Sequence, residues 1–188
     1  MKIFDAIRGR RTPVAANLDA LFLLPSAAIT LETAAGFTPV GSGAVCYRAA
    51  VGAAAVETQR DIVDLLNTDA EKPDVETTVD SFGFTWLTTH NADVSGLCTD
   101  LHAINTTIEL QGFGDSLLCS LAPFVDPAGR KVGLVYLYKQ GTFYPFAPTG
   151  PQTRDNLLEI QIRDQLAGDL PIEKDLSRWL ALWGAPTL

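Results

Sequence analysis

Residues 117–150 read LLCSLAPFVDPAGRKVGLVYLYKQGTFYPFAPTG, and this stretch decides the fold class. Runs rich in Val, Leu, Tyr and Phe, which strands prefer, alternate with two short turn signals. The first turn is Asp126-Pro127-Ala128-Gly129, because Pro presets φ, Asp can bond the backbone ahead and Gly accepts positive φ. Gln140-Gly141 marks the second reversal. The stretch therefore predicts three antiparallel strands at the centre of a sheet.

Further strands and helices are indicated on both sides of this stretch. Period-2 patterns predict strands within 37–49, 75–79 and 82–87, the last with an aromatic face formed by Phe82, Phe84 and Trp86. Apolar spacing of three and four predicts helices over 53–66, 94–110 and 153–166. In the last of these helices, Glu159 and Arg163 are spaced to form an i,i+4 ion pair.

Capping signals refine the two ends of the predicted domain. Asn17 is a good N-cap for a helix over 18–22, and Pro25-Ser26 interrupts it before a second short helix over 27–34. Near the other end, a short helix is expected to carry Trp179, Leu182 and Trp183. Short turns between neighbouring strands imply an antiparallel sheet. We predict an α+β domain over 17–188, with about five to six strands and helices packed on the sheet.

Length and composition set the broad class of protein. The chain has 188 residues, of which 47% are hydrophobic and 19% charged, as in a globular protein. No apolar run approaches the ~18–20 residues of a membrane span, and the first residues lack a signal-peptide core, so we expect a cytoplasmic protein. Cys46, Cys98 and Cys119 form no CxxC pair and are expected to be buried free thiols.

Charge is unevenly distributed along the chain, whose net charge is −8. Residues 1–16 form a basic segment and linker with four cationic residues against Asp5, which gives +3 and leaves −11 for the rest. The acidic body argues against nucleic-acid binding. In the basic segment, an apolar edge lies beside arginines, which predicts peripheral membrane contact through Ile3, Phe4, Ile7, Arg8, Arg10 and Arg11. Packing of this short helix against the domain is the alternative.

Motifs for catalysis or cofactor binding are missing from the sequence. The two histidines, His90 and His102, have no zinc-site spacing, and no Walker, GxGxxG or GxSxG pattern occurs. We therefore predict no catalytic residue, metal or cofactor. A small-molecule-binding domain, or a hydrolase that uses His102, Asp100 or Cys119, remains an alternative of another class.

An aromatic cluster surrounds the turn at Gln140. It can be a core strand that runs into a rigid loop, since Pro145 and Pro148 interrupt regular pairing. It can also be an exposed patch that docks a partner. The residues predicted for partner binding are Lys139, Gln140, Gly141, Phe143, Tyr144 and Phe146.

Three segments carry a resemblance to a known family. They are LVYLYKQGTFYPFAPTGPQTRDNLLEIQIRDQLAGDLPIEKDLSRWLALWGAP, TDLHAINTTIELQGFGDSLLCSL and NLDALFLLPSAAITLETAAGFTPVGSGAVCYRA, of which KQGTFYPFAP is the most specific part. With them the chain resembles the PspAB family, proteins associated with phage-shock protein A in actinobacteria and archaea. The resemblance implies a non-enzymatic adaptor in the envelope-stress response, with a PspA-like protein or an HtpX-like membrane metallopeptidase as partner.

The order of elements is also similar to that of type III secretion chaperones and YbjN-type proteins, which bind partners. This analogy in element order implies a third reading, a chaperone-like homodimer that holds an extended peptide.

Overall fold

The computed structural model describes residues 17–49, 53–68 and 74–188. The predicted basic segment and linker over 1–16 lie outside these residues. The helices are η1 (Leu18–Leu23), α1 (Leu24–Ala35), α2 (Ala53–Leu66), α3 (Val94–Ile108), η2 (Glu109–Phe113), η3 (Gly114–Ser116), α4 (Asn156–Leu166) and η4 (Leu176–Arg178). The strands are β1 (Thr38–Pro39), β2 (Ser42–Tyr47), β3 (Glu76–Val79), β4 (Thr85–His90), β5 (Leu117–Val125), β6 (Lys131–Leu137), β7 (Thr142–Phe146), β8 (Pro148–Gly150) and β9 (Thr153–Arg154).

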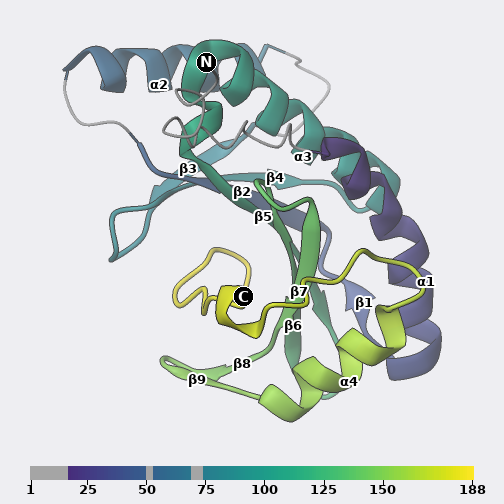
Figure 1. The fold of residues 1–188 in the computed structure, drawn as a ribbon. Helices are drawn as coiled ribbons and strands as arrows, with labels where there is room; N and C mark the ends of the chain where they lie inside the picture. The colour runs from purple at the N-terminus through teal and green to yellow at the C-terminus, as the bar shows by residue number, and fades with distance from the viewer. Residues whose placement is uncertain (1–16, 50–52, 69–73) are drawn as a thin grey trace, which may run out of the picture.

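One antiparallel sheet dominates the fold (Figure 1). Its strand order is β3-β4-β2-β5-β6-β7, and the short β1 pairs with β5 beyond the end of β2. The strands β8 and β9 form a separate two-stranded ribbon. This arrangement confirms the α+β fold class, and the predicted stretch 117–150 supplies three consecutive neighbours of the sheet, β5, β6 and β7.

Both turns of that stretch have the geometry that their residues favour. Gly129 N donates to Asp126 O at 2.9 Å, and the Asp126 carboxylate accepts from the backbone of Ala128 and Arg130. In the second turn, Gly141 has a φ of 68° and its N–H donates to Leu137 O at 2.9 Å. A left-handed residue of this kind is most easily a glycine.

The two faces of the sheet are covered differently (Figure 1). Helices α1, α3 and α4, with η1, lie over one face, which we call the helical face. Its core consists of buried side chains from the helices and from alternate strand positions, among them Leu31, Leu101, Val45, Leu134 and Phe143.

The opposite, concave face is covered by irregular chain. Residues 171–188, here called the C-terminal strap, cross this face, and Trp179 and Ala185 pack there against the other strand positions. The strap begins beside β7, where Phe143 N donates to Pro171 O and Glu173 N donates to Phe143 O.

Four local predictions need correction. Helix α1 runs through Pro25, because a proline in the first turn of a helix loses no hydrogen bond there. Asn17 precedes η1, but its side chain makes no capping bond. Helix α4 begins only at Asn156, since the two residues before Asp155 pair in β9. The short helix predicted around Trp179 is only the 3₁₀ turn η4, capped by Asp175.

The predicted Glu159–Arg163 ion pair is not formed. The Glu159 carboxylate is buried and accepts from Arg154 Nε at 2.8 Å, while Arg163 pairs with Asp164. The i,i+4 spacing was therefore a poor guide at this position, because tertiary packing directs Glu159 toward β9.

One helical stretch passes a membrane-span test that the sequence was expected to fail. Leu18–Ala35, which joins η1 and α1, is long and apolar enough to cross a membrane by length and composition alone. Leu21, Leu24 and Leu31 of this stretch are buried in the core of the helical face. Core helices can have the same length and composition, but Phe22, Leu23 and Ile29 of this stretch are exposed, so packing accounts for only part of its apolar character.

Candidate functional site: a groove on the concave face

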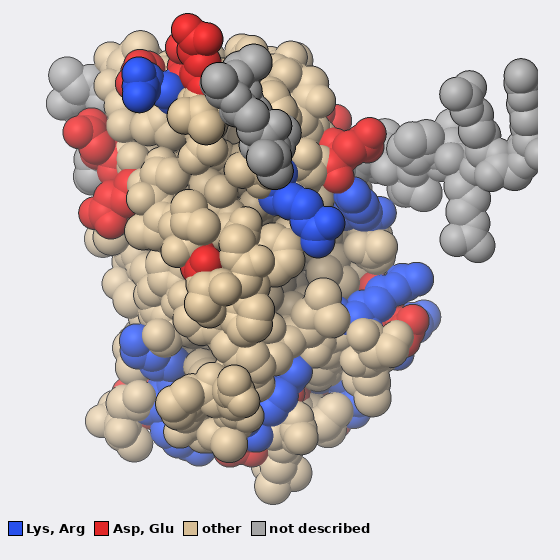
Figure 2. All heavy atoms as spheres, turned by 90° about the vertical axis from the view of Figure 1, so that its left-hand side faces the viewer, with Lys and Arg blue, Asp and Glu red and all other residues tan. Residues whose placement is uncertain are grey.

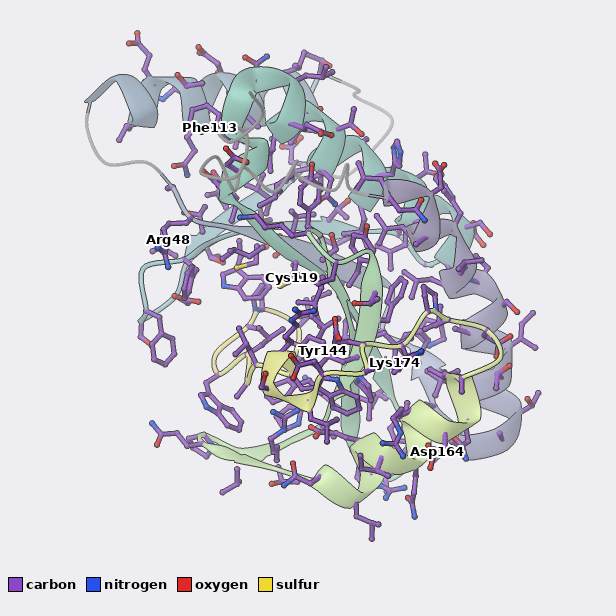
Figure 3. The ribbon with its side chains drawn as sticks, in the orientation of Figure 1. Arg48, Phe113, Cys119, Tyr144, Asp164 and Lys174 are labelled. Atoms are coloured by element: carbon purple, nitrogen blue, oxygen red, sulfur yellow. The ribbon has the colours of Figure 1, made fainter. Side chains whose placement is uncertain are left out.

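A groove of about 590 Å³ opens on the concave face between the β3–β4 hairpin and the C-terminal strap. In Figure 3, Arg48 lies toward the hairpin, and Cys119 and Tyr144 lie between the sheet and the strap. Its apolar wall is formed by Phe82, Phe84, Trp86, Leu118, Leu182 and Trp183. The volume falls in the range of roughly 300–1,000 Å³ that is typical of ligand pockets.

The pleat of the sheet and one irregularity in β5 direct side chains into the groove. Cys46 faces the groove while Tyr47 packs on the helical face, as strand alternation requires. Cys46 pairs with Cys119, but Tyr47 pairs with Leu117, so the register shifts by one residue. This bulge lets both Leu118 and Cys119 pack on the groove side.

Much of the apolar wall is accessible to solvent. Phe82 is 60% exposed and Leu180 is 62% exposed, and Phe84 and Trp183 are half-buried. Aromatic residues gathered in a recess, rather than scattered singly, mark a binding surface more often than an accident of packing.

The floor of the groove carries two buried thiols, those of Cys46 and Cys119. The side-chain hydrogen bond with Cys119 and burial both raise the pKa of Cys46 far above its ordinary value. Because the thiolate is the nucleophile and the metal ligand, this environment makes Cys46 inert rather than reactive. The third thiol, Cys98, is buried on the helical face, where burial raises its pKa to about 12. All three cysteines are free and buried, as predicted.

A single carboxylate, that of Asp80, shapes the hairpin side of the groove. Asp80 Oδ1 accepts from the N–H groups of Phe82 and Phe84, and Oδ2 accepts from Trp86 Nε1, each at 2.9 Å. Burial alone would raise the pKa of Asp80, but these hydrogen bonds outweigh it and lower the pKa below its ordinary value. The charge of Asp80 is thus engaged in holding the aromatic wall.

Three cationic side chains, Arg48, Lys139 and Arg178, also line the groove. The Arg48 guanidinium lies 5.5 Å from the centroid of Phe84, and Lys139 Nζ donates to Asp115 O at 2.8 Å. Arg178 is engaged with Glu173 and Asp175. Figure 2 shows a largely uncharged centre on this side of the molecule, with Lys and Arg around it and most Asp and Glu above.

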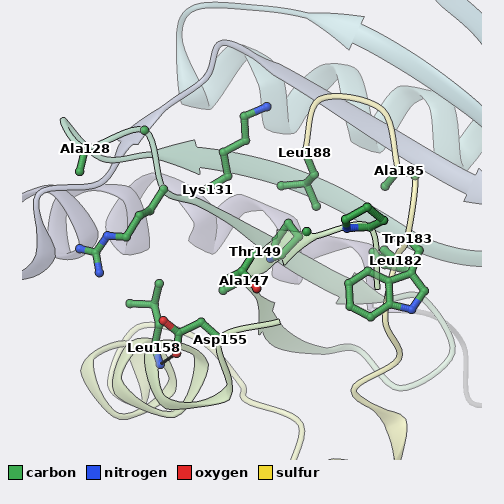
Figure 4. Close-up of a pocket in the computed structure, with 16 residues that line it drawn as sticks. Ala128, Lys131, Ala147, Thr149, Asp155, Leu158, Leu182, Trp183, Ala185 and Leu188 are labelled. Carbon is green, nitrogen blue, oxygen red and sulfur yellow. Dashed lines mark hydrogen bonds between the residues drawn. The ribbon is translucent and has the colours of Figure 1, made fainter. Parts of the chain in front are cut away.

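A second cavity, of about 600 Å³, lies on the other side of the strap (Figure 4). Leu182 and Trp183 line both cavities, so the strap divides the concave face in two. The polar groups of this second cavity serve the fold: Lys131 Nζ donates to Thr187 O, and Asp155 caps α4 by accepting from Leu158 N.

The aromatic part of the predicted partner-binding patch is not exposed. Phe143, Tyr144 and Phe146 are 0%, 1% and 0% exposed, and Tyr144 Oη donates to Leu180 O at 2.9 Å. They pack on the two faces of β7, as the core interpretation expects, and of the three only Tyr144 borders the groove; their contact with a partner stays a prediction. Lys139 and Gln140 are exposed and line the rim of the groove.

The residues considered for hydrolase chemistry are not brought together. Cys119 faces the groove, whereas Asp100 and His102 belong to α3, which covers the opposite face of the sheet. His90 is at the end of β4, where its Nε2 lies 3.5 Å from Glu76 Oε1. Within residues 17–49, 53–68 and 74–188, no group of three or more His, Cys, Asp or Glu side chains could hold a metal ion.

The sequence indicated only part of the groove. The alternation of Phe82, Phe84 and Trp86 predicted an aromatic face, and all three side chains line the groove on the concave side. Arg48 and Leu118 were not predicted as groove residues. The position of Arg48 depends on where β2 ends, and that of Leu118 depends on a bulge that no local sequence pattern marks.

Comparison with known proteins places the chain in a family. The family model described as PspA associated protein B matches residues 1–187. No curated protein and no solved structure gives a significant match, so the similarity in element order to secretion chaperones stays a prediction.

Proposed function

Because the chain belongs to the PspA associated protein B family, we propose that it is a non-enzymatic adaptor which binds a PspA-like protein in a phage-shock-type envelope stress response. The family match over 1–187 is the observation that carries this proposal. The exposed turn at Lys139–Gly141 and the open groove beside it supply a surface on which a partner can dock.

Asn17, which follows the predicted basic segment in the chain, lies beside the turn at Lys139–Gly141. Tyr136 Oη donates to Asn17 O at 2.9 Å, and a Cβ placed on Gly141 would lie 3.5 Å from Asn17 Cβ. Residues 1–16 are therefore attached to the body beside the exposed turn. In our proposal, a partner that contacts Lys139 and Gln140 lies beside Asn17, the residue at which the predicted membrane-contact segment with Ile3, Phe4, Ile7, Arg8, Arg10 and Arg11 joins the described chain.

This arrangement suits a protein that works at the inner face of the plasma membrane. In our proposal the basic segment makes peripheral contact with anionic lipid, and the body remains in the cytoplasm beside the PspA-like partner. An HtpX-like membrane metallopeptidase is the second partner that we propose to test, and a homodimer is a further form of the same adaptor.

A pull-down from membrane-containing lysate tests the adaptor. The baits are the full chain, a chain lacking residues 1–12, the variant Lys139→Glu, and Lys174→Glu as the control for an exposed lysine elsewhere. We expect the full chain and the control to recover a PspA-like protein or the peptidase, and Lys139→Glu to recover several-fold less. Recovery of neither partner by the full chain would overturn the proposal. Equal recovery by the full chain, by the chain lacking residues 1–12 and by Lys139→Glu would show that the predicted contact residues do not bind the partner.

Small-molecule binding is a second candidate function. The observation that favours it is the groove, whose volume and mixed apolar and cationic lining fit a ligand pocket.

A further inference from the structure

We propose that the groove binds the anion of a long-chain fatty acid, with the hydrocarbon chain against the aromatic wall and the carboxylate at Arg48 and Lys139. This ligand site rests on the second candidate function, small-molecule binding in the groove, and does not depend on the adaptor function.

The first argument concerns the hydrocarbon chain. Most of the surface in the groove is apolar, and Phe84 and Trp86 at the start of β4 and Leu118 of β5 provide part of it from the two sides of β2. The thiol of Cys46 is neutral because its pKa is raised, so it adds no charge to the floor. A flexible alkyl chain gains from leaving water along such a wall, in proportion to the apolar area that it covers.

The second argument concerns the position of the charge. Arg48 follows the end of β2 and its N–H donates to Ser116 O, while Tyr138, next to Lys139, donates its N–H to Leu118 O. Because β2 and β6 are the two neighbours of β5, the backbone at Arg48 and the backbone at Lys139 flank the start of β5, with the two outer strands about 10 Å apart. A carboxylate placed between them can be reached by both side chains.

The third argument concerns the sign of the charge. The chain as a whole has a net charge of −8, yet three cations and only one carboxylate line the groove. The carboxylate of Asp80 already accepts three hydrogen bonds from its own hairpin. Among the described residues, Arg48 has no ion-pair partner, and Lys139 donates only to a backbone carbonyl. The two are therefore available to an anion, and a local excess of positive charge in an acidic protein selects for one.

The form of the apolar surface favours a single chain over a bilayer or a protein helix. The wall is recessed between the hairpin and the strap, whereas a membrane-binding surface must project its apolar side chains into lipid. Arg48 and Lys139 both lie beside the start of β5, which matches a molecule with one charged end.

Binding of palmitate to the purified full chain tests the proposal. Trp86 and Trp183 line the groove, so their fluorescence reports on occupancy, and calorimetry gives the stoichiometry. We expect saturable binding of one palmitate per chain below its aggregation concentration. The uncharged methyl ester should bind about tenfold more weakly, because it cannot form charge-assisted hydrogen bonds to Arg48 and Lys139.

Three variants locate the site. Arg48→Gln should weaken palmitate binding about tenfold, and Lys174→Gln, the matched change of an exposed cation away from the groove, should leave it unchanged. Ala181→Trp should abolish binding by filling the groove, and its circular dichroism and thermal unfolding establish that it folds.

Several results would overturn the proposal. These are no saturable binding of palmitate, equal affinity for the methyl ester, and equal affinity in Arg48→Gln. Binding of phosphatidylglycerol vesicles or of an apolar peptide to the groove without binding of palmitate would assign the surface to a bilayer or to a protein partner instead.

Discussion

The helical face and the concave face are built on the same strands but are closed in different ways. On the helical face, regular helices supply rows of side chains such as Leu101 and Ile104, which are fully buried. On the concave face, irregular chain supplies a few large anchors, chiefly Trp179, and leaves Leu182 and Trp183 half-buried between two cavities.

The difference shows how one sheet can serve stability and binding at once. A helix repeats its apolar positions and covers a sheet evenly. The C-terminal strap has no repeating apolar pattern, so it covers the sheet only where single side chains contact it. Its backbone carbonyls are satisfied by individual hydrogen bonds, such as those from Trp179 Nε1 to Glu173 O and from Arg154 to Trp179 O. Stability should thus reside in the helical face, and access in the concave face.

The largest expected effect compares the same truncation on the two faces. Leu101→Ala should lower the free energy of unfolding by about 4 kcal/mol, because it leaves a cavity in a fully closed core. Leu182→Ala should cost about 1 kcal/mol, since the half-buried side chain loses less contact. Urea unfolding of both variants gives the two values. Equal losses would contradict the division of roles between the faces.

The next effect tests whether one anchor holds the strap. Trp179 is buried, stacks on Tyr144 with ring centroids 5.9 Å apart, and donates to Glu173 O. Trp179→Ala should cost about 3 kcal/mol and expose residues 171–188 to proteolysis. Trp183→Ala is the matched control and should cost about 1 kcal/mol. A strap that stays protected in Trp179→Ala would show that its other contacts suffice.

A smaller effect, dependent on pH, concerns the hairpin that borders the groove. The lowered pKa of Asp80 means that its carboxylate stabilises the fold above its unfolded pKa of about 4, and that this stability is lost as pH falls through the lower folded value. Asp80→Asn should cost about 1 kcal/mol at pH 7, after allowance for partial exposure. Thermal melts between pH 7 and 3 should show a weaker acid dependence in the variant than in the parent chain, and parallel curves would refute the assignment.

The smallest expected effect on stability is that of replacing Arg48. Arg48 is exposed and contacts the fold mainly through the face of Phe84. Arg48→Gln should alter the free energy of unfolding by no more than about 0.5 kcal/mol in urea. A much larger loss of unfolding free energy would mean that Arg48 serves to stabilise the sheet and is not held in reserve for a ligand.

The central sheet could be predicted from sequence because its signals are local. The turns at Asp126–Gly129 and Gln140–Gly141 depend on residues next to each other, and the structure confirms both. The strap could not be predicted, since the periodicity of Trp179, Leu182 and Trp183 suggested a helix. Their actual conformation is set by contacts with β7 and with Arg154, which are distant in sequence.

The groove was predictable only in its composition. The aromatic alternation at Phe84 and Trp86 is visible in the sequence, but whether those rings would be covered depends on the strap. The segment KQGTFYPF shows the converse, a surface feature suggested by composition but covered in the fold. Its aromatic residues suggested an interface, although both faces of β7 are buried, one under helices and the other under the strap.

The place of β2 in the sheet has a consequence for the order of folding. Val45 of β2 pairs with Leu87 on one side and with Ser120 on the other, so this strand joins two hairpin systems that are remote from it in sequence. The meander β5-β6-β7 needs only short loops to close, and such local pairings form early. We therefore expect the transition state to contain the meander and β2 to insert last. Alanine variants of Val135 and Val45 in stopped-flow experiments should give a high φ-value for the first and a low one for the second.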